Sequence, residues 1–234
     1  MNTAGLIAWI VGVLACSLAA PARSDALADA REAVRQIDRA TICRLDPKTG
    51  DLRYVGATDD RALACFRRHG AATRLVVTSP GGDVLKAIEA SALIAEADWQ
   101  VVVVGLCASS CANYWVPAAE SVEVRPYSAI LLHGAPTNAW LSASDHTRRH
   151  RDFERRHRVG RAWFSNWSTL DMLWTARARG NRPRMTMADE AFMRLHVPHT
   201  PIVAFWQPRT EQQRCELLEL LDGLLPMSIW TAPG

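Results

Sequence analysis

Short runs of β-branched and aliphatic residues recur through the middle of the 234-residue chain, separated by stretches with helical spacing. Runs that are mostly apolar and β-branched are typical of strands buried in a parallel sheet. They occupy residues 75–78, 100–104, 122–124 and 129–132. Residues 83–97 and 109–118 predict helices, so strands alternate with helices. This order favours right-handed crossovers and a mainly parallel sheet flanked by helices.

The segment before this region predicts further elements. Residues 24–40 carry apolar side chains along one helical stripe. Residues 41–45 and 52–55 predict two short strands on either side of a turn, and residues 56–60 open another helix.

Beyond residue 132 the pattern changes. Residues 144–179 predict one long helix that projects from the core, with arginines in its first half and tryptophans along one face of its second half. We interpret the arginines as a solvated helix face with Asp and Glu partners rather than as a binding patch. Residues 186–195 predict a capping box and a short helix. Residues 198–208 predict a loop or edge strand, and residues 210–225 a final amphipathic helix.

Composition narrows the class of protein. The hydrophobic fraction of 49% fits a packed core, and the length fits one domain with appendages. A formal net charge of +3 does not indicate nucleic-acid binding. The chain has only two lysines, Lys48 and Lys86, and neither is placed to act as the base of a serine–lysine pair.

The first residues of the chain indicate the cellular compartment in which the protein is found. An apolar run over residues 4–20 is short for a bilayer span and is followed by small-residue motifs at residues 20–22 and 24–26. We therefore expect a cleaved export signal over residues 1–22, which leaves a periplasmic protein with no stable membrane span. An uncleaved anchor and a lipoprotein processed at Cys16 are the alternatives.

Export permits disulfide bonds. Removal of the signal leaves five cysteines. Cys107 and Cys111 have a spacing that closes a tight bridge, which would leave Cys43 to pair with Cys65, and Cys215 free. Crossed pairings and five buried thiols are alternatives, because connectivity cannot be deduced from spacing. The cysteine spacings match neither zinc nor redox motifs, so we expect no metal site.

Two predicted strands run into small residues that open a helix. They give the motifs TSPGG at residues 78–82 and GLCASS at residues 105–110. Such turns present unpaired N–H groups beside the positive end of a helix dipole, and these groups can hold an oxyanion. The strand at residues 129–132 is followed by His133. A serine on a tight turn, glycine amides and a histidine at a strand end together indicate acyl transfer by a serine nucleophile.

These two motifs, with LLHG at residues 131–134, resemble the ClpP/crotonase fold. The pattern is most similar to the proteolytic subunit of the Clp protease and to its exported relatives, which also carry cysteines around the serine turn. The resemblance implies an α/β fold of repeated ββα units, with a mainly parallel sheet and a long projecting helix. The core would span residues 54–195, after an N-terminal helix and strand segment at residues 23–53. A C-terminal loop and helix would occupy residues 196–234.

The resemblance also implies roles for particular residues. Ser109 takes the position of the nucleophile, with Ser110 as its rival, and His133 takes the position of the general base. The oxyanion amides come from Gly82 or Gly81 together with Ser110. The histidine would accept the hydroxyl proton during attack, and the N–H groups would stabilise the charge that develops on the carbonyl oxygen.

The acid of the site is less well defined by the pattern. Asp189, with Glu190 as its rival, stands near the position of the family's acid, but Asp189 equally suits a helix cap. A dyad of Ser109 and His133 is the alternative. The sequence contains no Gly-x-x-x-x-Gly-Lys-[Ser/Thr] motif, so we expect no ATPase activity of its own and no cofactor.

The sequence therefore predicts an exported, homo-oligomeric serine peptidase that cleaves small or unfolded polypeptides. One alternative is a non-catalytic member of the family that keeps the fold for assembly or peptide binding. A second is a crotonase-type enzyme that acts on acyl-CoA thioesters. The export signal argues against this second alternative, because coenzyme A is a cytosolic cofactor.

Overall fold

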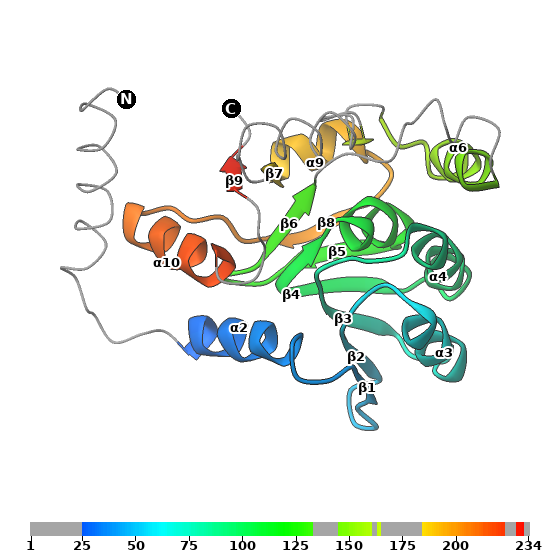
Figure 1. Cartoon of the computed structure of the whole chain (residues 1–234), viewed down its shortest axis with the longest axis horizontal. Helices are drawn as coiled ribbons and strands as arrows, with labels where there is room; N and C mark the ends of the chain where they lie inside the picture. The colour runs from blue at the N-terminus through cyan, green and yellow to red at the C-terminus, as the bar shows by residue number, and fades with distance from the viewer. Residues whose placement is uncertain (1–24, 133–144, 161–162, 165–183, 223–227, 232–234) are drawn as a thin grey trace, which may run out of the picture.

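The structure is a computed structural model that describes residues 25–132, 145–160, 163–164, 184–222 and 228–231. Its strands form one sheet with helices on both faces (Figure 1). The expected export signal, Cys16 and His133 lie outside the described residues. Within those residues, no helix has the length and apolar character needed to cross a membrane.

The first part of the chain follows the predicted alternation of strands and helices. The strands are β1 (Ile42–Leu45), β2 (Asp51–Val55), β3 (Arg74–Ser79), β4 (Gln100–Ala108), β5 (Ser121–Val124) and β6 (Ala129–Leu132). The helices are α2 (Asp25–Gln36), α3 (Asp60–Arg68), α4 (Val84–Glu96), the π-helix η1 (Cys111–Trp115) and α5 (Val116–Ala118). β4 is longer than predicted, because the strand continues through Gly105, whose φ is +72°. The helix predicted from residue 109 instead starts after Ser110, as a π-helical turn.

The second part of the chain differs more from the prediction. Its elements are α6 (Asp145–His157), β7 (Arg184–Ala188), α9 (Glu190–His196), β8 (Ile202–Phe205), α10 (Glu211–Asp222) and β9 (Ser228–Thr231). Residues 186–188, predicted as the start of a helix, instead belong to β7, where they pair with β6. This pairing overrides the local capping pattern, and the helix begins three residues later.

The single helix predicted over residues 144–179 is not confirmed, because α6 ends at His157. Arg158 adopts a positive φ of 49°, and the N–H of Gly160 donates to the carbonyl of His196, which turns the chain onto α9. Trp163 is buried there and stacks on Phe192. The other residues predicted on the same helix face, Trp167, Leu170 and Trp174, lie outside the described residues.

The strand order is β1-β2-β3-β4-β6-β7-β9, and β5 pairs with both β4 and β8. Strands β2, β3, β4 and β6 are parallel neighbours, whereas β1–β2 and β6–β7 are antiparallel. Single strands alternate with single helices from β2 to β4, so the expected repeat of two strands and one helix is not confirmed. A parallel pair needs a crossover between its strands, and α3 and α4 supply those crossovers.

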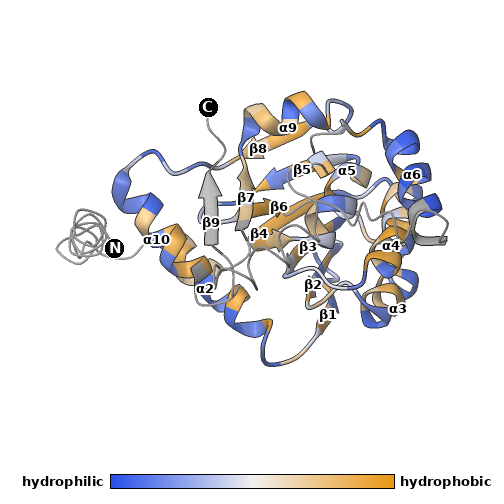
Figure 2. Ribbon diagram, turned by 45° about the horizontal axis from the view of Figure 1, so that its top comes forward, coloured by the Kyte–Doolittle hydropathy of each residue, from blue (hydrophilic) through white to orange (hydrophobic). Residues whose placement is uncertain are grey.

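Two apolar cores lie on the two faces of the sheet. The larger core lies under α3, α4 and η1 and contains a cluster in which Tyr54 contacts Phe66 and Trp115 edge to face. The smaller core lies under α2 and α10 (Figure 1). The hydropathy colouring shows apolar strands between the helices and a mostly hydrophilic α6 (Figure 2).

Candidate active site

The candidate site lies where four parallel strands end. In the sheet, Val55 of β2 pairs with Thr78, Ser79 of β3 pairs with Cys107, and Ala108 of β4 pairs with Leu131. The carboxyl ends of parallel neighbours meet at one edge, and ligands bind there in open α/β sheets. The turns that follow β2, β3 and β4 therefore converge, and they carry Thr58, the Gly81–Gly82 pair and the Ser109–Ser110 pair.

Ser109 stands on a sharp turn between β4 and η1. Its φ is +56°, a left-handed conformation that costs a non-glycine residue about 1–2 kcal/mol. The turn is fixed on both sides: the N–H of Ser109 donates to the carbonyl of Leu131 at 2.9 Å, and the N–H of Asn113 donates to the carbonyl of Ser109 at 2.8 Å. Ser109 is partly exposed. A serine on a strained turn from strand to helix is the arrangement that presents a nucleophile in hydrolases of other folds.

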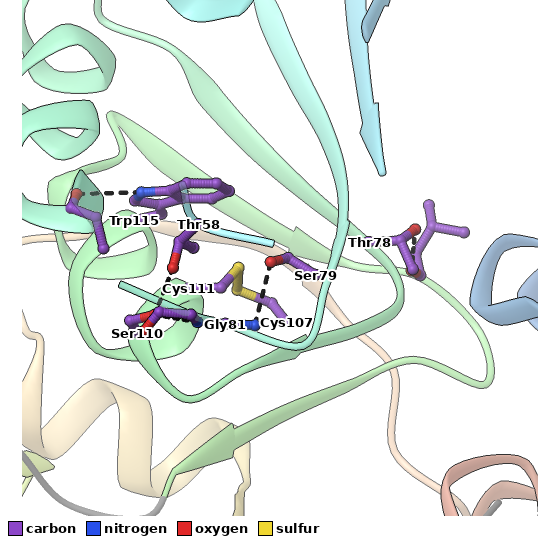
Figure 3. Close-up of a disulfide and its surroundings, with 11 residues drawn as sticks. Thr58, Thr78, Ser79, Gly81, Cys107, Ser110, Cys111 and Trp115 are labelled. Atoms are coloured by element: carbon purple, nitrogen blue, oxygen red, sulfur yellow. Dashed lines mark hydrogen bonds between the residues drawn. A yellow bond between two sulfur atoms is a disulfide. The ribbon is translucent and has the colours of Figure 1, made fainter. Parts of the chain in front are cut away.

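Ser110, the rival nucleophile, points into the protein. It is only 1% exposed, and its Oγ lies 2.6 Å from Thr58 Oγ1 (Figure 3). The same Oγ accepts the N–H of Gly82 at 2.7 Å. A hydroxyl held in this way cannot reach a substrate in solution, so the geometry favours Ser109 as the reactive serine.

The glycine turn packs directly against Ser109. A methyl group on Gly81 would lie 2.5 Å from the Cβ of Ser109 and 3.0 Å from the main-chain nitrogen of Ser110. The N–H of Gly81 donates to Ser79 Oγ at 3.2 Å, whereas the N–H of Gly82 is engaged by Ser110. Gly81 and Gly82 were both predicted to supply an oxyanion-hole amide. The Gly81 amide lies beside the serine turn and makes the longer of the two hydrogen bonds.

Both expected disulfides of the described core are present. Cys107 and Cys111 are bonded and enclose the serine turn, and Cys43 and Cys65 join β1 to α3. The expectation that Cys215 is free is wrong, because Cys215 is also disulfide-bonded. The Cys107–Cys111 bridge is buried and restricts the chain on either side of Ser109 (Figure 3).

His133 lies outside the described residues. The described residue before it, Leu132, is the last residue of β6. The pairing of β4 with β6 ends with Ala108 opposite Leu131. Ala108 is the last residue of β4, and Ser109 follows it directly. The sequence position of His133 therefore follows the strand that neighbours the serine turn.

Asp189 and Glu190 are not brought to Ser109. β7 runs antiparallel to β6, with Thr186 opposite Leu132 and Ala188 opposite Ile130. Asp189 therefore follows the end of β7 that lies beside the start of β6. Ser109 lies beside the end of β6, about 10 Å away along the strand direction. Its carboxylate caps α9 by accepting the N–H of Phe192 at 2.6 Å. Glu190 pairs with Arg194 on the same helix.

This position yields a test of the role of Asp189. We expect Asp189→Ala to lower the free energy of unfolding by about 1 kcal/mol and Asp189→Asn to change it little, because asparagine caps a helix as well as aspartate does. Neither variant should change the rate of labelling by a fluorophosphonate. If Asp189→Asn instead loses labelling as fully as Asp189→Ala, the carboxylate acts in the reaction. Urea unfolding and labelling rates measure the two effects.

Lys86, which follows the glycine turn in the sequence, is not available as a base. The Nζ of Lys86 lies 2.9 Å from the Asp60 carboxylate, which raises the pKa of Lys86 by accepting its hydrogen bond and by its charge. Lys86 therefore keeps its proton at neutral pH. In the described part of the chain, no three His, Cys, Asp or Glu side chains gather in a way that would hold a metal ion.

Comparison with solved structures finds similarity to a protease catalytic domain. That structure is the ClpP protease catalytic domain from Plasmodium falciparum, with a TM-score of 0.41 and 12% sequence identity. The match covers 69% of this chain and 90% of the other. No protein-family model and no curated protein matches the sequence.

Proposed function

We propose that the protein is an exported serine peptidase that cleaves small or unfolded polypeptides without an ATPase of its own. The observation that carries the proposal is the turn at Ser109: a partly exposed serine with a φ of +56°, packed against Gly81. Strained backbone in a serine, held by hydrogen bonds on both sides, is a feature of functional sites.

In the proposed reaction, His133 accepts the proton of the Ser109 hydroxyl as its oxygen attacks a peptide carbonyl carbon. The N–H groups of Gly81 and Ser110 stabilise the negative charge on the carbonyl oxygen, and the Gly81 amide exchanges its long bond to Ser79 for this oxygen. The C–N bond then breaks as His133 returns the proton to the leaving amine. Water, activated by the same histidine, hydrolyses the acyl-enzyme ester and restores Ser109.

The disulfides support the proposed compartment. Disulfides form and persist in oxidising environments, and a bridge next to the serine turn would be lost in a reducing cytosol. Export through the signal at residues 1–22, and assembly into a homo-oligomer, are parts of the same proposal.

The test is covalent labelling of the folded, oxidised protein by a fluorophosphonate, with the adduct located by peptide mass spectrometry. We expect one adduct per chain, in the segment between Cys107 and Cys111 and on Ser109. Heat-unfolded protein is the control and should not react. An unlabelled folded protein, or an adduct in another segment, would overturn the proposal.

A specific observation favours the second candidate, a non-catalytic protein that binds peptides or assembles. Side-chain oxygens from within the chain accept the N–H groups of both Gly81 and Gly82. The expected carboxylates also lie at the other end of β6. In this case the folded protein would bind an unfolded polypeptide with unchanged affinity after Ser109→Ala, and it would not react with the fluorophosphonate.

A further inference from the structure

A third turn takes part in the site, and the sequence motifs do not include it. Thr58 follows β2, which β3 and β4 separate from β6, yet it is fully buried between the glycine turn and the serine turn. Its N–H donates to the carbonyl of Gly81 at 3.0 Å, and residues 58 and 82 form an isolated parallel bridge. Its Oγ1 lies 2.6 Å from Ser110 Oγ (Figure 3).

Ser110 Oγ is the point at which the three turns meet. It accepts the N–H of Gly82 at 2.7 Å and lies 3.2 Å from the Gly82 carbonyl. Thr58 Oγ1 in turn lies 3.3 Å from the carbonyl of Asp83, which caps α4. Two hydroxyls therefore join the main chain of Gly82 and Asp83 to Ser110, the residue that follows Ser109.

The close approach depends on the absence of a side chain at Gly82. A Cβ there would lie 3.1 Å from both the main-chain nitrogen and the Oγ1 of Thr58. The second glycine of the TSPGG motif thus admits Thr58, while the first glycine admits Ser109. Each glycine therefore makes room for a different neighbouring residue.

We infer that Thr58 is a positioning residue, which holds the Gly81–Gly82 turn in register with the Ser109–Ser110 turn through its hydroxyl contact with Ser110. The inference rests on the proposed function for its catalytic consequence. The N–H groups of Gly81 and Ser110 belong to the two turns that Thr58 ties together. Fixed donors stabilise a developing charge only if their spacing is fixed as well, so this contact sets the geometry of the proposed oxyanion hole.

The experiment replaces Thr58 with valine, which keeps the shape and removes the hydroxyl, and with serine, which keeps the hydroxyl. Thr200→Val is the matched control, because Thr200 is also buried and donates one side-chain hydrogen bond, to the carbonyl of Pro117, which belongs to none of the three turns. The readouts are the hydrolysis of p-nitrophenyl acetate, fluorophosphonate labelling and amide hydrogen exchange.

For Thr58→Val we expect kcat and the labelling rate to fall at least tenfold with KM unchanged, because the contact acts on the transition state rather than on substrate binding. Thr58→Ser should recover both rates to within about threefold of the wild type. Thr200→Val should match the wild type. Exchange of the Gly82 amide should be faster in Thr58→Val alone. A Thr58→Val protein with wild-type kcat, or an equal loss in Thr200→Val, would overturn the inference.

Two further outcomes remain decisive. If the wild type does not react at all, the proposed function fails, and amide exchange alone decides the inference: unchanged exchange at Gly82 in Thr58→Val overturns it, and faster exchange upholds the positioning contact. If Thr58→Val does not fold, Ser110→Ala breaks the same contact from the other side. It should then show the same tenfold loss of kcat, and wild-type kcat would overturn the inference.

Discussion

Replacing Ser109 with alanine is expected to abolish fluorophosphonate labelling, a loss of at least about 10³-fold. Replacing Ser110 with alanine should slow labelling about tenfold without abolishing it, because the Ser110 hydroxyl is buried and holds the glycine turn. The two neighbouring serines thus serve as controls for each other. Labelling that persists in Ser109→Ala, or that disappears only in Ser110→Ala, would contradict the assignment of the nucleophile.

A glycine at position 109 should lose reactivity, as alanine does, but should give a more stable protein than alanine. Ser109→Gly removes the hydroxyl and also the left-handed strain of about 1–2 kcal/mol, while glycine's greater freedom in the unfolded chain costs about 0.5–1 kcal/mol. We therefore expect this inert variant to unfold in urea at a free energy about 0.5–1 kcal/mol above that of Ser109→Ala. An equal or lower stability of Ser109→Gly would mean that the turn at Ser109 holds no strain.

The sequence was informative where local pattern and tertiary structure agree. The apolar runs predicted β3, β4, β5 and β6, since buried parallel strands need apolar residues on both faces. The motifs also predicted that Gly81 and Ser109 lie at the same edge of the sheet, because parallel strands end there together. The Cys107–Cys111 pair was predicted from its short spacing, and Cys43–Cys65 was the pair that then remained; both are present.

The errors occurred where distant residues override a local signal. Residues 186–188 match a capping box, yet pairing with β6 makes them a strand. The end of α6 is an exception, because it is capped locally: Arg158 is left-handed and the N–H of Val159 donates to the carbonyl of Glu154. Gly160 was an available stop signal that the prediction of one long helix did not use. Thr58 was missed because a single threonine before a helix has no distinctive spacing. Its place at the end of a third parallel strand was the available signal.

Replacing Gly81 with alanine should damage both fold and reactivity. The added methyl group would lie 2.5 Å from the Cβ of Ser109 and 2.6 Å from the carbonyl oxygen of Ala108, in a backbone with a φ of +89°. Overpacking of about 1–3 kcal/mol and conformational strain of about 1–2 kcal/mol together predict a loss of about 2–5 kcal/mol in the free energy of unfolding. Reactivity per folded molecule should fall about 100-fold, because the serine turn must shift.

Alanine substitutions at two other glycines distinguish a loss of stability from a loss of reactivity. Gly105→Ala meets similar strain, with a φ of +72° and the Val34 methyl at 2.7 Å, but away from the serine turn. It should lose stability and keep the labelling rate of the folded protein. Gly70→Ala meets no atom within 4 Å and should change the free energy of unfolding by less than about 0.5 kcal/mol. If Gly81→Ala labels like the wild type once corrected for the folded fraction, contact with the serine turn does not control its reactivity. If Gly105→Ala loses as much labelling, reactivity follows stability alone.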